Sequence, residues 1–313
     1  MSNMPQSTKV VAIVCSDLHL SHKVPIFRSA ESNWYGTMET CLREIDNLQK
    51  AQDNCPILCC GDLFDKWNSP PELINFALAH LPNKMVCIPG QHDLPNHNID
   101  DINRSAYWTL VESGKIINLS SEKTHLCNGV NVTAFPYGTD LKPSASFNSL
   151  SIALCHQYVH CKGHAHPQAL AEDNIYNVVG KDIRYRYNVM FFGDNHNGFQ
   201  TQCGKETTVI NCGSIMKRHA NEIDYKPSVW LLFNNGCVGR HELNISQDQC
   251  LDLTSSDGEN LENMNMEELV SCLASIEADS FDFQEALENY MHKNRTRKAV
   301  VQLLQNIMEE TGV

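Results

Sequence analysis

An apolar run that ends in a carboxylate and an imidazole decides the fold: Lys9-Val10-Val11-Ala12-Ile13-Val14-Cys15-Ser16-Asp17-Leu18-His19. Its β-branched residues predict a buried strand, and Asp17 and His19 follow where that strand would end. Side chains two residues apart at a strand end point to the same side. The stretch therefore predicts a strand with a pair of metal ligands at its carboxyl end.

The same pattern, an apolar run followed by a polar motif, recurs four times along the chain. The runs are residues 56–60, 85–88, 152–155 and 189–192, and they lead into Gly61-Asp62-Leu63-Phe64-Asp65, Gly90-Gln91-His92-Asp93, His156 and Gly193-Asp194-Asn195-His196. Glycine begins three of these motifs, at turns where the backbone must approach a ligand closely. We therefore expect distant segments to bring their polar groups to one edge of a sheet, where they form a metal site.

Length and charge limit the classes of function. The chain has 313 residues, of which 42% are hydrophobic, enough for a large core and a small appendage. Its formal net charge of −13 argues against a broad basic surface for nucleic acid. Any phosphate must therefore be bound locally, by metal ions.

The cysteines and the absence of long apolar segments indicate the compartment. Several of the 14 cysteines fall inside predicted strands, where a free thiol behaves as a small hydrophobic group, and no Cys-x-x-Cys pair occurs. No window approaches the ~20 apolar residues of a membrane span, and the first residues do not form a signal peptide. We expect a soluble protein of the reducing cytoplasm, with no membrane partner.

Alternating strand-like and helix-like segments up to about residue 243 indicate a layered α/β fold. Helices are expected over residues 37–52 and 71–81. The pairs Asn128-Gly129 and Asn235-Gly236 lie between apolar runs and predict tight hairpins, so the sheets should contain antiparallel pairs. Residues 252–265 read as a linker, followed by three helices over residues 266–276, 281–291 and 297–308.

The ligand set indicates two ions. A carboxylate such as Asp62 can bridge divalent ions roughly 3.5–4 Å apart. The motifs contain more candidate ligands than one ion needs. Besides Asp17 and His19 they include Gln91, His156, Asp194 and His196. Mixed carboxylate, imidazole and amide ligands suit Mn²⁺, Fe²⁺ or Zn²⁺, and the absence of thiolates argues against a structural zinc site.

In this order the motifs resemble those of the calcineurin-like metallophosphoesterase superfamily, DxH, GDxxD, GNH(D/E), a lone His and GHxH, over residues 9–245. The resemblance implies an α/β/β/α sandwich for residues 1–250, with residues 251–313 as an acidic linker and a helical cap or partner-docking segment. It also implies hydrolysis of a phosphoester by a metal-bound hydroxide.

The resemblance assigns roles to individual residues. One ion would be held by Asp17, His19 and His196 and the other by Gln91, His156 and Asp194, with Asp62 bridging both. His92 would face the scissile phosphate as a general acid or charge stabiliser, with Asp65 orienting it. Lys217 and Arg218 are further candidates for contact with the phosphate.

Two positions depart from the family pattern. Gln91 stands where the family has Asn, which keeps an amide oxygen but adds a methylene. Asp194 replaces the first His of the last motif, which exchanges a neutral imidazole for a hard, charged ligand and tilts the expected metal toward Mn²⁺ or Mg²⁺. Residues 163–166 match GHxH literally but lack a preceding apolar run, so we expect a loop near the site.

Within the superfamily, the sequence from residue 61 to residue 93 is most similar to SbcD-type DNA repair nucleases, which share a "GDLFD…PPE…PGNHD" order. The expected function is therefore a manganese-dependent DNA nuclease, with exonuclease and endonuclease modes both open. A coiled-coil ATPase similar to SbcC is the implied partner, and a homodimer is left open. The alternatives are a phosphatase or phosphodiesterase for small molecules or phosphoproteins, and a non-catalytic scaffold.

Overall fold

The computed structural model describes residues 8–119, 121, 123–143, 149–164, 169–179, 187–203, 207–219 and 222–250. The chain divides into two units, Met1–Leu253 and Thr254–Val313, and every described residue belongs to the first. The three C-terminal helices expected from the sequence lie outside the described residues and stay a prediction.

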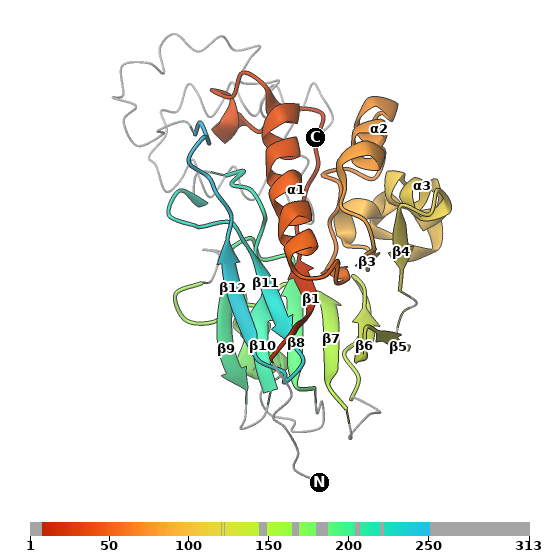
Figure 1. The fold of residues 1–313 in the computed structure, drawn as a ribbon, viewed down its shortest axis with the longest axis vertical. Coiled ribbons are helices and arrows are strands. Elements are labelled where there is room, and N and C mark those ends of the chain that lie inside the picture. The colour runs from red at the N-terminus through yellow and green to blue at the C-terminus, as the bar shows by residue number, and fades with distance from the viewer. Residues whose placement is uncertain are drawn as a thin grey trace, which may run out of the picture. The chain divides into compact units, whose positions relative to one another are not determined.

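A mixed six-stranded sheet carries the first three motifs (Figure 1). Its strands, in spatial order, are β12 (Val238–Glu242), β11 (Ser228–Phe233), β1 (Val10–Cys15), β2 (Ile57–Cys59), β3 (Met85–Cys87) and β4 (Ile116–Asn118). The strands from β1 to β4 are parallel, whereas β11 pairs antiparallel with β1 and β12. The carboxyl ends of β1, β2 and β3 therefore share one edge of the sheet.

A second six-stranded sheet carries the last two motifs. Its strands, in spatial order, are β5 (Thr124–Cys127), β6 (Val130–Phe135), β7 (Ser151–His156), β8 (Val189–Gly193), β10 (Thr207–Asn211) and β9 (Phe199–Cys203). The strands β6, β7, β8 and β10 are parallel, and an antiparallel strand closes each edge. Both expected hairpins are confirmed, because the turns at Asn128-Gly129 and Asn235-Gly236 join antiparallel strands.

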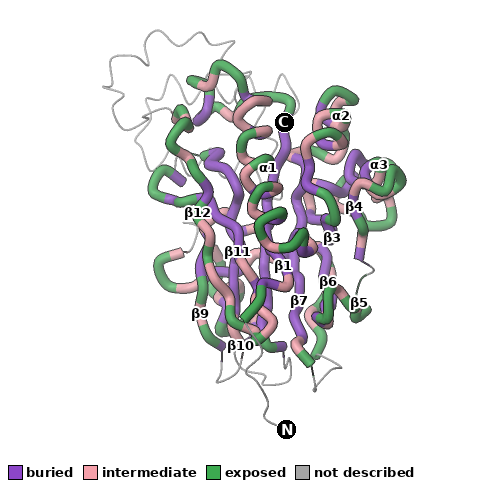
Figure 2. Tube along the Cα trace, viewed as in Figure 1, coloured by how far each residue is buried: buried purple, intermediate pink, exposed green. Residues whose placement is uncertain are grey.

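Three apolar clusters separate four layers, and the central strands of the sheets are buried (Figure 2). Alternate residues of one strand enter different clusters, since successive side chains point to opposite faces of a sheet. In β1, Ile13 packs with the residues of the helices, whereas Val14 packs between the two sheets. In β7, Leu154 lies between the sheets and Ala153 faces the outer layer. The expected α/β/β/α sandwich is thereby confirmed.

The helices cover the outer faces of the two sheets. They are α1 (Trp34–Ala51), α2 (Pro71–His80), α3 (Ala106–Glu112) and α4 (Ile175–Val178), and 3-10 turns lie at Ile26–Arg28, Gln91–Asp93, Pro95–His97, Ile99–Arg104 and Ala171–Asp173. The first three contribute to the cluster on the first sheet, and Ile175 of α4 contributes to the cluster on the second. None of the helices within the described ranges combines the length and apolar composition needed to cross a bilayer.

Candidate metal centre

The backbone turns sharply where the motif strands end. Four of the expected ligands have left-handed backbone conformations, with φ of 52° at Asp17, 42° at His19, 53° at Asp62 and 81° at Asp194. Such conformations are unfavourable for residues with a side chain and cluster at functional sites. The strained turns direct carboxylates and imidazoles from both sheets toward one place.

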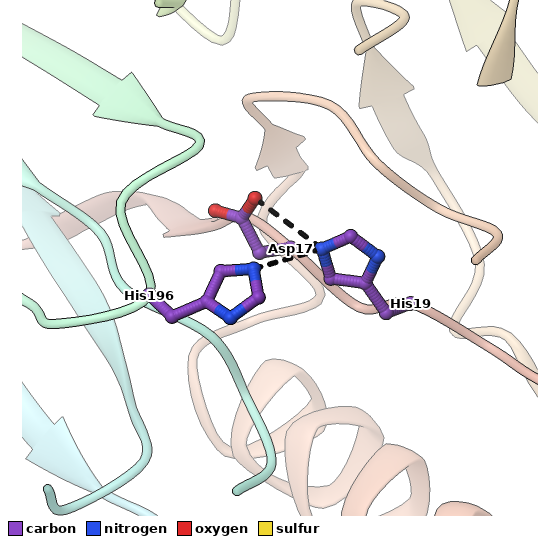
Figure 3. A group of neighbouring side chains, drawn as sticks. All are labelled: Asp17, His19 and His196. Carbon is purple, nitrogen blue, oxygen red and sulfur yellow. Dashed lines mark hydrogen bonds and ion pairs between the residues drawn. The ribbon is translucent and has the colours of Figure 1, made fainter. Parts of the chain in front are cut away.

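Asp17, His19 and His196 form the first group of candidate ligands (Figure 3). The Nε2 atoms of the two imidazoles are 3.0 Å apart, and Asp17 Oδ1 is 3.8 Å from His19 Nε2. Ligand atoms at adjacent corners of an octahedron lie about 3.0 Å apart when each is about 2.1 Å from the ion. The spacing of the imidazoles therefore fits two ligands of one divalent ion.

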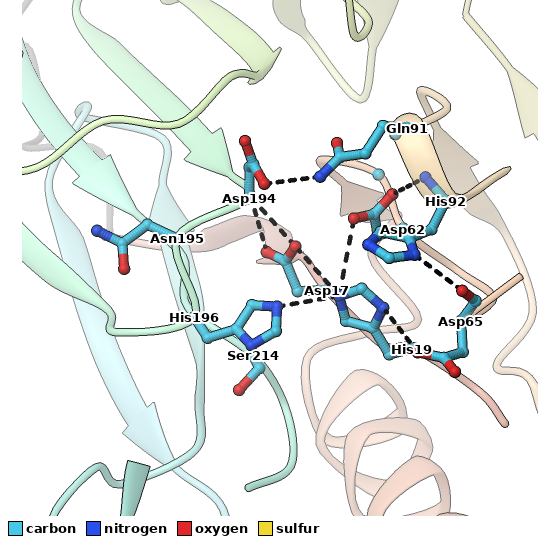
Figure 4. A network of polar contacts seen from close by, with 12 residues as sticks. Asp17, His19, Asp62, Asp65, Gln91, His92, Asp194, Asn195, His196 and Ser214 are labelled. Atoms are coloured by element: carbon cyan, nitrogen blue, oxygen red, sulfur yellow. Dashed lines mark hydrogen bonds and ion pairs between the residues drawn. The ribbon is translucent and has the colours of Figure 1, made fainter. Parts of the chain in front are cut away.

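Gln91, His156 and Asp194 form a second group of candidate ligands, and Figure 4 shows Gln91 and Asp194 directed toward each other. Gln91 Oε1 is 2.6 Å from His156 Nε2, and Gln91 Nε2 donates a hydrogen bond of 2.7 Å to Asp194 Oδ1. The longer side chain at position 91 thus still reaches both expected co-ligands. The structure brings together all seven residues that the sequence nominates as metal ligands.

Asp62 lies between the two groups. Its Oδ2 atom is 3.7 Å from His19 Nε2 and 3.3 Å from His156 Nε2, and its Oδ1 accepts a hydrogen bond from the backbone N–H of His92. The side chain is buried, and Oδ2 has no hydrogen-bond partner among the described residues. A buried carboxylate oxygen normally has a partner, so its position between imidazole nitrogens of both groups fits a bridging metal ligand.

The electrostatics of the cluster also fit cations. Burial raises the pKa of Asp17 to about 6; the charges of His156 and His196 lower it, and the neighbouring Asp62 carboxylate raises it. Burial likewise raises the pKa of Asp194, again with a contribution from Asp62. Buried carboxylates that repel one another are stabilised by positive charge. Divalent ions are suitable sources of that charge, because the ligands are hard oxygens and imidazoles.

Glycine at position 90 is a steric requirement of the site. A Cβ atom there would lie 2.1 Å from Asp62 Oδ1 and 2.6 Å from His156 Nε2. Any larger residue would therefore displace two candidate ligands at once. This close approach is the reason for glycine in the third motif.

His92 is half-buried beside the candidate ligands. Its Nδ1 lies 2.8 Å from the backbone carbonyl oxygen of Asp65, and its ring meets the ring of His19 edge to face at 4.8 Å between centroids. A carbonyl oxygen only accepts, so Nδ1 donates the hydrogen bond. Asp65, which the resemblance makes the residue that orients His92, contacts it through its backbone oxygen, whereas its carboxylate forms an ion pair with the Arg218 guanidinium.

The two basic candidates make contacts within the protein. The Arg218 guanidinium donates to the backbone oxygen of His19 and to the Asp65 carboxylate. Lys217 Nζ donates a 2.5 Å hydrogen bond to the backbone oxygen of Ile223. Both side chains are largely buried. Arg218 therefore lies at the rim of the metal centre, whereas the ammonium group of Lys217 is directed into its own loop.

Two carboxylates near the site were not singled out from the sequence. Asp93 accepts hydrogen bonds from the backbone N–H groups of Leu63, Phe64 and Gly90, so it joins the second and third motif loops. Burial raises the pKa of Asp93 to about 7, with a further contribution from Asp62. Glu222 lies 2.8 Å from Nδ1 of His196. Of these two carboxylates, only Asp93 could have been identified from the sequence, because it belongs to the third motif.

The described half of the literal match to the last motif belongs to a loop, as expected. Gly163 and His164 lie in a turn, and Asn195 donates a hydrogen bond of 3.0 Å to the backbone oxygen of His164. Residues 165–168 lie outside the described residues. The described part of this segment is therefore tied to the last motif through Asn195.

Comparisons with known proteins identify one matching family and similar solved structures. Residues 11–198 match the model of a family described as calcineurin-like phosphoesterase. The structure is similar to TT1561 of Thermus thermophilus, with 14% identity and a TM-score of 0.45 over 75% of this chain and 100% of that one. It is also similar to a putative 5'-nucleotidase from Staphylococcus aureus, with 11% identity and a TM-score of 0.45 over 79% of this chain and 56% of that one. No curated protein matches the sequence.

Proposed function

The chain belongs to the calcineurin-like phosphoesterase family of metal-dependent hydrolases, and from this premise we propose that it hydrolyses phosphodiester bonds with two divalent ions. The observation that carries the proposal is the buried Asp62 Oδ2, which has no hydrogen-bond partner among the described residues and lies between imidazoles of two ligand groups. Manganese is the ion we propose, because Asp194 adds a hard carboxylate oxygen to the imidazole donors.

Each part of the site has a separate task in this proposal. Asp17, His19 and His196 would hold one ion, Gln91, His156 and Asp194 the other, and Asp62 would bind both. When bound, such ions polarise the phosphoryl group and lower the pKa of bound water. In its doubly protonated form, His92 would keep the Nδ1 proton on the Asp65 carbonyl oxygen and give the Nε2 proton to the leaving oxygen. Arg218 would hold Asp65 and the His19 backbone in place.

We propose DNA as the substrate. Support comes from the SbcD-like order of Gly61–Asp65, Pro70-Pro71-Glu72 and Pro89–Asp93. The net charge of −13 gives the chain little attraction for a duplex by itself. A coiled-coil ATPase partner, or a second copy of the chain, would then supply the surface that holds DNA.

The same charge favours a second candidate. A chain with a net charge of −13 disfavours long polyanions, so a small phosphoester or a phosphoprotein is the alternative substrate. Two ions suit this reaction equally well. A non-catalytic scaffold is disfavoured, because His92 and a complete set of candidate ligands come together.

Removal of metal should abolish the activity. We expect protein treated with a chelator to lose hydrolysis of bis(p-nitrophenyl) phosphate, and added Mn²⁺ to restore it, because the site's oxygen and imidazole donors need bound cations to polarise the substrate. Linear and single-stranded DNA should be cleaved under the same conditions. Cleavage of the chromogenic diester without any action on DNA would favour the small-substrate alternative. Hydrolysis that survives complete metal removal would contradict the proposed function.

A further inference from the structure

Glu222 is a buried carboxylate against the metal centre. It lies in the segment between β10 and β11 and is 1% exposed. Its Oε1 atom is 2.8 Å from Nδ1 of His196. A carboxylate this close to an imidazole nitrogen accepts a hydrogen bond from it, so Glu222 constrains where the His196 proton lies.

The contact selects one tautomer of His196. Because an ionised carboxylate only accepts hydrogen bonds, Nδ1 of His196 must carry the proton. In the neutral ring, Nε2 then presents its lone pair. That atom is the one that lies 3.0 Å from His19 Nε2 within the first ligand group. Glu222 thus prepares the nitrogen that a divalent ion would bind.

The second oxygen of the same carboxylate holds the neighbouring turn. Oε2 accepts hydrogen bonds from the backbone N–H of Arg218 at 2.6 Å and of His219 at 3.2 Å. Arg218 in turn donates to Asp65 and to the His19 backbone. One buried carboxylate therefore links His196, which follows a strand of the second sheet, to the turn at Arg218, which contacts the motif loops of the first sheet.

We propose that Glu222 is a positioning residue of the metal centre: it holds His196 in the tautomer and orientation that bind a divalent ion. The proposal rests on the proposed two-metal function and names a residue outside the ligand set. The 2.8 Å contact with His196 Nδ1 and the two backbone donors on the other oxygen fix the position of this carboxylate.

Mn²⁺ binding to the metal-free, full-length protein tests the proposal. Glu222→Gln keeps the size of the side chain, but its amide NH₂ must face either His196 Nδ1 or the backbone donors. Loss of a partner that orients a metal-bound histidine typically weakens metal affinity about 10–100-fold. By titration calorimetry we expect Glu222→Gln to bind one of the two Mn²⁺ ions about 10–100-fold more weakly than the wild type does.

Two further variants separate positioning from other roles. Glu31→Gln removes another largely buried carboxylate, paired with Arg28 at 2.5 Å, so it should lower the thermal stability but leave Mn²⁺ affinity unchanged. His219→Ala addresses direct coordination, because His196, His219 and Glu222 also have ligand atoms within 4.8 Å of one another. If Glu222 only positions His196, His219→Ala should bind Mn²⁺ like the wild type.

The tautomer itself can be observed in the wild type. Selective ¹⁵N labelling of histidine, with His196 assigned by its loss in His196→Gln, should show a proton on Nδ1 and none on Nε2. This measurement holds even if the Glu222 variants fail to fold. A proton on Nε2, or wild-type Mn²⁺ affinity in a folded Glu222→Gln, would overturn the positioning role and leave the two-metal function intact. A wild-type protein that binds no Mn²⁺ would overturn both.

Discussion

Asp62→Asn is expected to reduce hydrolysis by about 10³-fold, since metal ions supply several kcal/mol of charge stabilisation and each 1.36 kcal/mol is a factor of ten. The substitution preserves the size of the side chain. Asn can keep Oδ1 as the acceptor for the His92 backbone N–H, which places its NH₂ group between His19 and His156. An NH₂ group cannot ligate a cation, so the bridge between the two groups is lost.

The measurement for this variant combines steady-state kinetics with metal analysis. We expect Asp62→Asn to retain fewer Mn²⁺ ions per chain than the wild type after gel filtration. Asp53→Asn is a suitable control, because Asp53 is an exposed carboxylate paired with Lys9 outside the metal centre. Wild-type activity and two retained ions in Asp62→Asn would show that this carboxylate bridges nothing.

His92→Ala should lower kcat by about 10²–10⁴-fold, the usual contribution of a general acid. In contrast to Asp62→Asn, this variant should keep both ions, because His92 is assigned to the leaving group and not to either ion. The loss should be larger for DNA, whose leaving alkoxide needs a proton, than for a nitrophenyl ester, whose leaving group is stable as an anion.

Comparison of the two substrates distinguishes proton donation by His92 from charge stabilisation. An equal loss of kcat for the nitrophenyl ester and for DNA would contradict proton donation by His92 and favour charge stabilisation instead. A loss of bound metal in His92→Ala would mean that His92 belongs to the ligand set. That outcome has a structural basis, since ligand atoms of His19, Asp65 and His92 lie within 4.8 Å of one another.

Features that depend on local sequence were predicted well. The strands before each motif and both Asn-Gly hairpins are encoded by neighbouring residues, so they could be read from the order of residues alone. The start of α1 was placed three residues late, at Thr37. The helix begins at Trp34 because the Asn33 side chain accepts a hydrogen bond from the backbone N–H of Gly36 and caps it.

Contacts between distant loops could not be predicted in the same way. Arg218 and Asp65 are 153 residues apart, and the sequence around each residue does not predict that the guanidinium pairs with the Asp65 carboxylate. Glu222 follows His196 by 26 residues and belongs to none of the five motifs. Such pairs are created by the packing of two sheets, which brings together loops that have no relation in sequence.

The most direct test is anomalous diffraction from crystals grown with Mn²⁺. Two anomalous peaks should appear roughly 3.5–4 Å apart, the usual spacing in two-metal sites. One should lie beside Asp17, His19 and His196, the other beside Gln91, His156 and Asp194, with Asp62 between them. Peaks located away from these residues, or their complete absence from a crystal saturated with Mn²⁺, would contradict the two-metal centre.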